Sequence, residues 1–102
     1  MLAVLRQTVL GAALSAGSRA QLTTWIVERQ TGGKRLRAHN RRGWKAGDKT
    51  GSGGHAATND IAVFWPPQRP AILVTAYYAE SLATDAERNA VIAAVGRLAI
   101  AA

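Results

Sequence analysis

Apolar residues recur at helical spacing over the first part of the chain. Leu2, Leu5, Val9 and Ala13 follow one another three or four positions apart, and other apolar residues stand beside them. This spacing places them on one face of a helix, because an α-helix turns once every 3.6 residues. We therefore predict an amphipathic helix over residues 2–14, ended by the small residues that follow.

A second helix is predicted directly after the first. Ser18 followed three residues later by Gln21 forms a capping-box pattern, which is typical of a helix N-terminus. The apolar residues that follow fall on one face, namely Leu22, Trp25 and Ile26. The helix is expected over residues 19–30 and should stop before two consecutive glycines.

The pattern changes period after these glycines. Residues 34–40 are polar and fit either a short helical turn or a surface loop. Residues 44–48 indicate a short strand that leads into residues 49–54, whose glycines mark a tight bend or a close backbone approach at the end of the strand. Residues 61–65 and 71–78 are apolar runs, and the first is closed by two prolines. They indicate neighbouring antiparallel strands, which gives three strands side by side.

The last predicted element is a helix that reaches the C-terminus. Thr84 with Glu87 forms another capping box, and apolar residues continue at helical spacing. The predicted order is helix, helix, three-stranded antiparallel meander, helix. This is an α/β protein of the α+β type, with the C-terminal helix packed on the sheet. At 102 residues, 48% of them hydrophobic, the chain is expected to form a single small domain over residues 1–102.

The net charge of +7 is concentrated in one segment. Residues 19–45 hold eight basic side chains against Glu28 alone, whereas four basic and five acidic residues follow residue 45. The basic residues of the segment are Arg19, Arg29, Lys34, Arg35, Arg37, Arg41, Arg42 and Lys45. A small basic nucleic-acid-binding protein is thus an alternative interpretation. We do not expect nucleic acid as a partner, because aromatic residues are not interleaved as stacking platforms.

Several other classes are not expected. The chain has no cysteine, which excludes disulfides and thiolate zinc sites, and no cofactor is expected. His39 and His55 stand sixteen positions apart without partners at metal spacing, so we expect both at the surface. Arg6 and Gln7 interrupt the N-terminal apolar run. We therefore expect no membrane span and no signal peptide, hence a cytoplasmic location if the chain is made as it stands.

One polar string resembles a known family. Residues 48–53 contain Lys49-Thr50-Gly51, and residues 58–63 and Trp65-Pro66 follow. This pattern is similar to the C-terminal part of the class A serine β-lactamases. Other matching positions occur in family order, at Leu5-Arg6, residues 18–22, Trp25, Thr31-Gly32, Gly43-Trp44 and Glu87-Arg88-Asn89. The resemblance implies an incomplete β-lactamase-like fold and a parent enzyme that is periplasmic or secreted. That parent hydrolyses β-lactam antibiotics, its small-molecule partners, through a serine acyl-enzyme.

The resemblance also implies roles for residues of the string. Lys49 supplies a fixed positive charge beside the substrate, and Thr50 hydrogen-bonds the substrate carboxylate next to Gly51. The backbone N–H of Ser52 is one of two oxyanion donors. Many relatives carry an arginine where Thr58 stands here. Some relatives supply the guanidinium from the segment that holds Arg35, which would then support the carboxylate.

Three motifs of the family are not found in the 102 residues. The serines are Ser15, Ser18, Ser52 and Ser81, and none of them begins a Ser-x-x-Lys nucleophile motif. A Ser-Asp-Asn motif and the loop with the deacylating glutamate are also missing. We therefore expect the isolated chain to be inactive. An upstream reading frame with a Ser-x-x-Lys motif, or a separate N-terminal part of the same fold, would complete the enzyme. Without either, the chain is a remnant.

Overall fold

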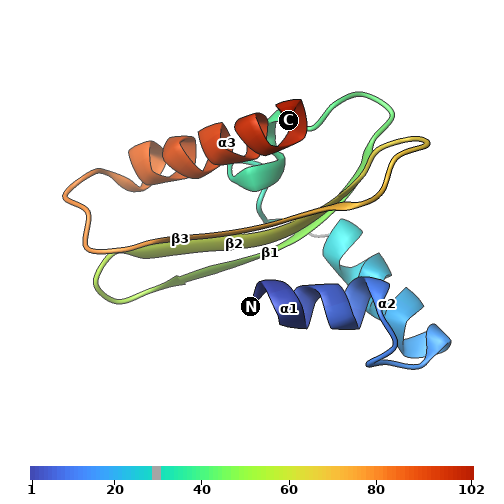
Figure 1. The fold of residues 1–102 in the computed structure, drawn as a ribbon. Helices are drawn as coiled ribbons and strands as arrows, with labels where there is room; N and C mark the ends of the chain where they lie inside the picture. The colour runs from blue at the N-terminus through green and yellow to red at the C-terminus, as the bar shows by residue number, and fades with distance from the viewer. Residues whose placement is uncertain (29–30) are drawn as a thin grey trace.

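The computed structural model describes residues 1–28 and 31–102 of the chain. Its elements form three layers, with α1 and α2 on one face of a sheet and η2 and α3 on the other (Figure 1). In chain order the elements are α1 (Leu2–Leu5), η1 (Arg6–Leu10), α2 (Ala16–Val27), η2 (Leu36–His39), β1 (Lys45–Gly53), β2 (Ala57–Trp65), β3 (Ile72–Tyr78) and α3 (Asp85–Ala101). The predicted α+β class and order of elements are confirmed.

The first helical segment is shorter than predicted. The α-helix α1 continues into η1, a single turn of π-helix, and ends at Leu10 instead of residue 14. The reason lies at Gly11, whose backbone is extended with φ of −94° and ψ of −160°. The Arg19 guanidinium of α2 donates to the Gly11 carbonyl at 2.6 Å, so this end of the helix is held from the next element.

The second helix begins three residues earlier than the capping-box pattern predicts. Ser15, and not Ser18, is the N-cap of α2, and its hydroxyl accepts the backbone N–H of Ser18 at 3.2 Å. The Ser18–Gln21 pattern is therefore inside the helix and does not mark its start. The helix ends at Val27, and the predicted residues 29 and 30 lie outside the part of the chain that the structure describes.

The predicted C-terminal helix is confirmed, and of the two alternatives for residues 34–40 the helical turn is present. Residues 34–40 contain a helical turn, the 3-10 helix η2. Thr84 caps α3 through a complete capping box: its hydroxyl accepts the Glu87 N–H at 3.2 Å, and the Glu87 carboxylate accepts the Thr84 N–H at 3.0 Å. The pKa of the exposed Glu87 carboxyl is lowered, first by the hydrogen bond from the Thr84 backbone N–H and then by the Thr84 side chain.

The sheet is the predicted antiparallel meander, with strand order β1-β2-β3. Strand β1 is longer than expected, because residues 49–53 continue its ladder with β2 down to the pair Gly53 and Ala57. The tight bend comes only afterwards. His55 and Ala56 both have φ of 57°, and the Ala57 N–H bonds the Gly54 carbonyl at 3.2 Å.

Alternate residues of the central strand β2 supply two separate cores. Ala62 and Phe64 face η2 and α3, where they contact Leu36, Ile92 and Ile100. Val63 faces the opposite side and packs against Leu5, Val9 and Ile26. Because this part of the strand is covered on both faces, residues 61–65 form a continuous apolar run. Within the described residues, no helix has the length and apolar character of a membrane span.

Candidate functional site

The string that carries the predicted site lies on strand β1. In the described part of the chain β1 is an edge strand, paired with β2 alone. Successive side chains of a strand point to opposite faces of a sheet. Asp48, Thr50 and Ser52 therefore point to the side of η2 and α3, and Lys49 and Gly51 belong to the side of α1 and α2.

A polar cleft of about 430 Å³ brings three of the five predicted site residues together. Thr50 and Ser52 line one side of it, and Arg35 comes from the segment just before η2. The remaining lining is Thr31, Gly32, Gly33, Lys34 and Asn89. Gly51 is a fourth predicted site residue, and its carbonyl accepts a hydrogen bond from Arg35 at 3.2 Å. It is therefore connected to the cleft through Arg35.

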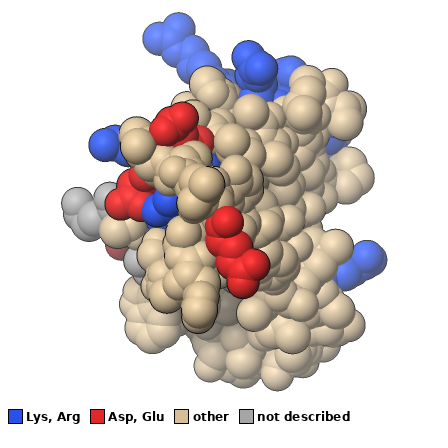
Figure 2. Space-filling view, turned by 90° about the vertical axis from the view of Figure 1, so that its left-hand side faces the viewer, with Lys and Arg blue, Asp and Glu red and all other residues tan. Residues whose placement is uncertain are grey.

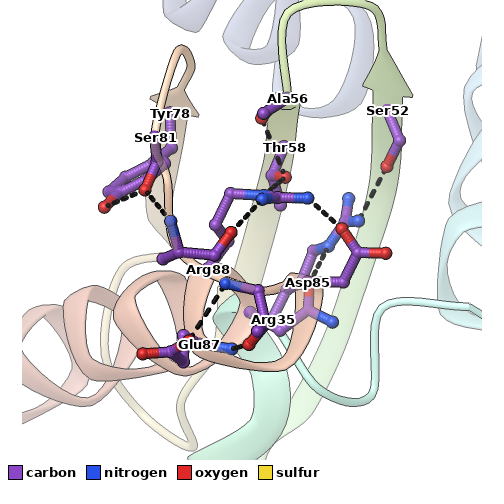
Figure 3. A network of polar contacts seen from close by, with 12 residues as sticks. Arg35, Ser52, Ala56, Thr58, Tyr78, Ser81, Asp85, Glu87 and Arg88 are labelled. Carbon is purple, nitrogen blue, oxygen red and sulfur yellow. Dashed lines mark hydrogen bonds and ion pairs between the residues drawn. The ribbon is translucent and has the colours of Figure 1, made fainter.

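Arg35 is fastened to three elements at once. Its Nε donates to Asn89 Oδ1 of α3 at 2.8 Å, and one terminal nitrogen donates to the Asn59 carbonyl of β2 at 2.8 Å. The other terminal nitrogen donates to Ser52 Oγ at 2.7 Å (Figure 3). A guanidinium has five N–H donors in a planar fork, so these contacts fix its orientation while it remains charged.

Lys49 lies apart from this cleft. Its side chain lines an apolar cavity of about 380 Å³ on the other face, together with Val4 and Trp25. Its Nζ donates to the Thr50 carbonyl at 2.7 Å. Trp25 is 64% exposed, whereas Trp44 and Trp65 are half-buried.

Two residues of the cleft were not assigned a role from the sequence. Thr31 Oγ1 lies 3.3 Å from Thr50 Oγ1 across the mouth of the cleft, and Asn89 holds Arg35 from α3. Asn89 is 54 positions from Arg35 in the chain, so no local pattern links them. The matching positions Thr31-Gly32 and Glu87-Arg88-Asn89 are the signal that could have pointed to both residues.

Thr58, which stands where many relatives carry an arginine, is contacted by a guanidinium from another element. Arg88 Nε of α3 donates to Thr58 Oγ1 at 3.0 Å, and the same side chain forms an ion pair with Asp85 (Figure 3). Thr58 is 4% exposed. Arg88 and Arg35 line a second, smaller cavity of about 300 Å³ behind Ser52.

Two carboxyl groups are buried beneath the cleft. Asp48 and Asp60 are 1% and 0% exposed. Arg37 Nε lies 3.2 Å from Asp48 Oδ1, and the Leu36 N–H donates to Asp60 Oδ2 at 3.0 Å. Burial, and then the hydrogen bond and the charge of Asp48, raise the pKa of Asp60 to about 8.

The basic segment does not form one continuous surface. Arg35 and Arg37 are half-buried and held by the contacts above, and Arg41 lies over the Trp44 ring at 5.2 Å. Arg29 is outside the described residues. Figure 2 shows one end of the molecule, where acidic side chains lie from the left side to the middle with a basic one between them, and the other basic side chains project from the margins. His39 and His55 are both exposed, as expected.

The fold matches solved structures of class A β-lactamases. The structure superposes on that of an ancestral class A β-lactamase (GNCA) with a TM-score of 0.95 and 55% sequence identity. The superposition covers 99% of this chain and 39% of the ancestral one. The fold and the Lys-Thr-Gly strand therefore define a segment of the class A β-lactamase type.

Sequence comparisons agree with this assignment. All 102 residues match the family Beta-lactamase2, described as the beta-lactamase enzyme family. The chain is 42% identical over 92 residues to beta-lactamase AER-1 of Aeromonas hydrophila, covering 90% of this chain and 30% of that protein. It is 41% identical over 98 residues to beta-lactamase CTX-M-25 of Escherichia coli, covering 96% and 34%. The chain belongs to the β-lactamase enzyme family and spans about a third of the length of these relatives.

Proposed function

We propose that this chain forms the substrate-carboxylate and oxyanion side of a class A serine β-lactamase, an enzyme that is periplasmic or secreted. The reaction of such an enzyme is an acyl transfer. A serine oxygen bonds the lactam carbonyl carbon, the carbon–nitrogen bond breaks, and the nitrogen takes a proton; water then hydrolyses the ester. The observation that carries the proposal is the convergence of Arg35, Thr50 and Ser52 on one cleft, in a chain of this family.

Each group suits one part of this chemistry. The Arg35 guanidinium and the Thr50 hydroxyl bind the carboxylate of the β-lactam at the open side of the cleft. The Ser52 N–H donates to the developing oxyanion. Gly51 has no side chain, which leaves room for the substrate beside the strand. Lys49 attracts the carboxylate from the opposite face of the same edge strand, since a charge acts over several ångströms without contact. No cofactor enters this scheme.

The nucleophile and the deacylating base must come from outside these 102 residues. The isolated chain should therefore hydrolyse a chromogenic cephalosporin no faster than a buffer control. The measurement is the initial rate at several substrate concentrations. Saturable turnover that disappears in a Lys49→Ala variant would contradict this expectation.

A chimaera tests the role of Arg35 directly. In it, this chain replaces the corresponding 39% of the ancestral class A enzyme, which supplies the remaining residues. Arg35→Ala should raise KM for penicillins by about 10-fold or more, because a charge-assisted hydrogen bond to the carboxylate is lost. Arg35→Lys should recover part of this loss, since it keeps the charge without the planar fork.

Arg42→Ala is the matched control, because Arg42 is exposed and belongs to the same basic segment. It should leave KM unchanged within about 2-fold, as expected for a screened surface charge. Equal increases for the Arg35 and Arg42 variants would show that Arg35 acts only through net charge. The melting temperature of each variant separates loss of binding from loss of folding.

A further inference from the structure

The buried acids Asp48 and Asp60 are neighbours on one face of the sheet. In the β1–β2 register Asp60 lies opposite Thr50, and Asp48 is two residues away from Thr50 along β1. The two carboxyl groups are thus diagonal cross-strand neighbours, close enough for Asp48 to raise the pKa of the Asp60 carboxyl. Both face the layer of η2 and α3, and neither reaches solvent.

The basic groups around the two acids balance the negative charge of only one of them. Arg37 forms the ion pair with Asp48, and Arg35 is the basic group close to Asp60. On the far side of β2 the residue opposite Asp60 is the uncharged Ala76. Arg35 has its guanidinium committed to Asn89, Ser52 and two carbonyls. Two ionised carboxylates in contact and without water repel each other strongly, so one proton between them is favoured.

The hydrogen-bond partners of the carboxyl oxygens, within the described residues, also favour one shared proton. Apart from the Arg37 ion pair, both oxygens of Asp48 and Oδ1 of Asp60 are buried without a donor. A proton on Asp60 Oδ1 directed at Asp48 supplies a donor to one acceptor and removes one orphaned oxygen. The remaining oxygen of Asp60, Oδ2, stays free to accept the Leu36 N–H.

The pair fastens the segment that carries Arg35. Residues 35–37 are consecutive, and each of them is tied to the sheet: Arg35 to the Asn59 carbonyl, Leu36 to Asp60, and Arg37 to Asp48. Arg37 also donates to the carbonyls of Val27 and Thr31 at 3.2 and 3.1 Å. The acid pair therefore holds the segment at two adjacent points directly below the cleft.

We propose that Asp60 is a positioning residue for Arg35, because it retains a proton, donates it to Asp48, and anchors the Leu36 backbone with its other oxygen. The pair carries one negative charge, which Arg37 balances. The effect on β-lactam binding rests on the function proposed above, whereas the shared proton and the anchoring of Arg35 do not.

The pH dependence follows from the direction of the shift. Burial and Asp48 raise the pKa of Asp60 to about 8, while the Leu36 N–H and Arg35 act in the opposite direction. The folded chain therefore binds this proton more tightly than the unfolded chain, whose aspartates titrate near about 4. The stabilisation is fully present below about pH 4, decreases between these two values, and is lost once the pH has risen through about 8.

Carbon-13 NMR of the carboxyl groups, recorded on the 102-residue chain without substrate, tests the proposal. The variants are Asp60→Asn, which mimics the protonated acid, Asp60→Ala, and the exposed control Glu80→Gln. Two further readouts are the melting temperature as a function of pH and the Nε–H signal of Arg35 near neutral pH. Because no β-lactam is present, failure here is distinguishable from failure of the proposed function.

We expect one buried carboxyl in the wild type to titrate at least about 2 pH units above an ordinary aspartate. The melting temperature should fall from pH 5 to pH 9 in the wild type and in Glu80→Gln, by about the same amount, and stay nearly flat in Asp60→Asn. Asp60→Asn should keep the dispersed Arg35 Nε–H signal, and Asp60→Ala should lose it. An ordinary titration of every aspartate, or an Asp60→Asn variant as pH-sensitive as the wild type, would overturn the proposal even if Asp60→Ala does not fold.

Discussion

At the scale of single residues, Gly32 is where the wall of the cleft meets the buried acids. Its φ of 93° lies in the region that favours glycine, and a Cβ built on it would stand 1.9 Å from Asp48 Oδ2. Both conditions exclude a side chain at this position. The close approach lets residues 31–33 descend onto the sheet and form one side of the cleft.

Gly32→Ala should destabilise the fold by about 3 kcal/mol or more, because it combines an unfavourable backbone conformation with a clash against a buried carboxylate. Gly33→Ala is the matched control, since a Cβ there meets nothing within 4 Å. It should change the free energy of unfolding by no more than about 0.5 kcal/mol. Urea denaturation of both variants provides the measurement, and similar costs for both would contradict the role given to Asp48.

Several properties of the candidate site could be predicted from the residues alone. The alternation of strand residues is enough to place Thr50 and Ser52 on one face and Lys49 on the other, provided that the string is known to be a strand. The glycines indicated a tight bend or a close backbone approach at the end of the strand, so the separation of Lys49 from the cleft was not predicted. The Arg35–Asn89 contact joins segments 54 residues apart, and only the packing of α3 on the sheet creates it.

At the scale of elements, local sequence patterns predicted where the helices lie better than where they begin and end. Ser15 and Ser18 are both residue types that favour an N-cap position. The spacing between Ser18 and Gln21 does not decide which of the two serines begins the helix. The choice depends on Gly11, whose extended backbone ends the first helix early, and on Arg19, which bonds the Gly11 carbonyl from α2. In contrast, the Thr84 capping box was predicted correctly because both of its bonds are local.

Helix α3 contacts η2 through Gly96, where a Cβ would lie 2.0 Å from the Leu36 carbonyl oxygen. Gly96→Ala should therefore destabilise the fold by about 2 kcal/mol, although alanine is the better helix former. Gly17→Ala near the start of α2 should have the opposite sign and add up to about 1 kcal/mol, because a Cβ there meets nothing within 4 Å. Thermal unfolding of the two variants checks the signs; stabilisation by Gly96→Ala would show that α3 and η2 are not in contact.

At the scale of the whole molecule, apolar side chains remain exposed on both outer layers. On α3 they form a stripe at helical spacing, Val91, Val95 and Leu98, exposed by 42%, 39% and 68%. On the opposite side Val4 and Trp25 are exposed by 56% and 64% beside the apolar cavity. Contiguous apolar patches of this kind favour association in water.

We expect the isolated chain to associate in a concentration-dependent way, as measured by size-exclusion chromatography with light scattering. Replacing Val4 and Trp25 together by glutamine should reduce this association. The control is Leu82→Gln, which removes a fully exposed leucine from a loop and should have little effect, because a single exposed apolar residue is common in folded proteins. A wild-type chain that stays monomeric at about 100 μM would contradict the expectation.

The division of β1 between two faces has a consequence for how this segment can change in evolution. Deleting or inserting one residue upstream of Lys49, while the β1–β2 hydrogen-bond ladder is kept, would turn Lys49 toward the cleft and Thr50 away from it. Such a change would also move the Asp48 side chain away from Gly32. Lineages of this chain should therefore conserve the length of β1 between Lys45 and Gly53, and tolerate a gap in this hairpin only at the turn around His55.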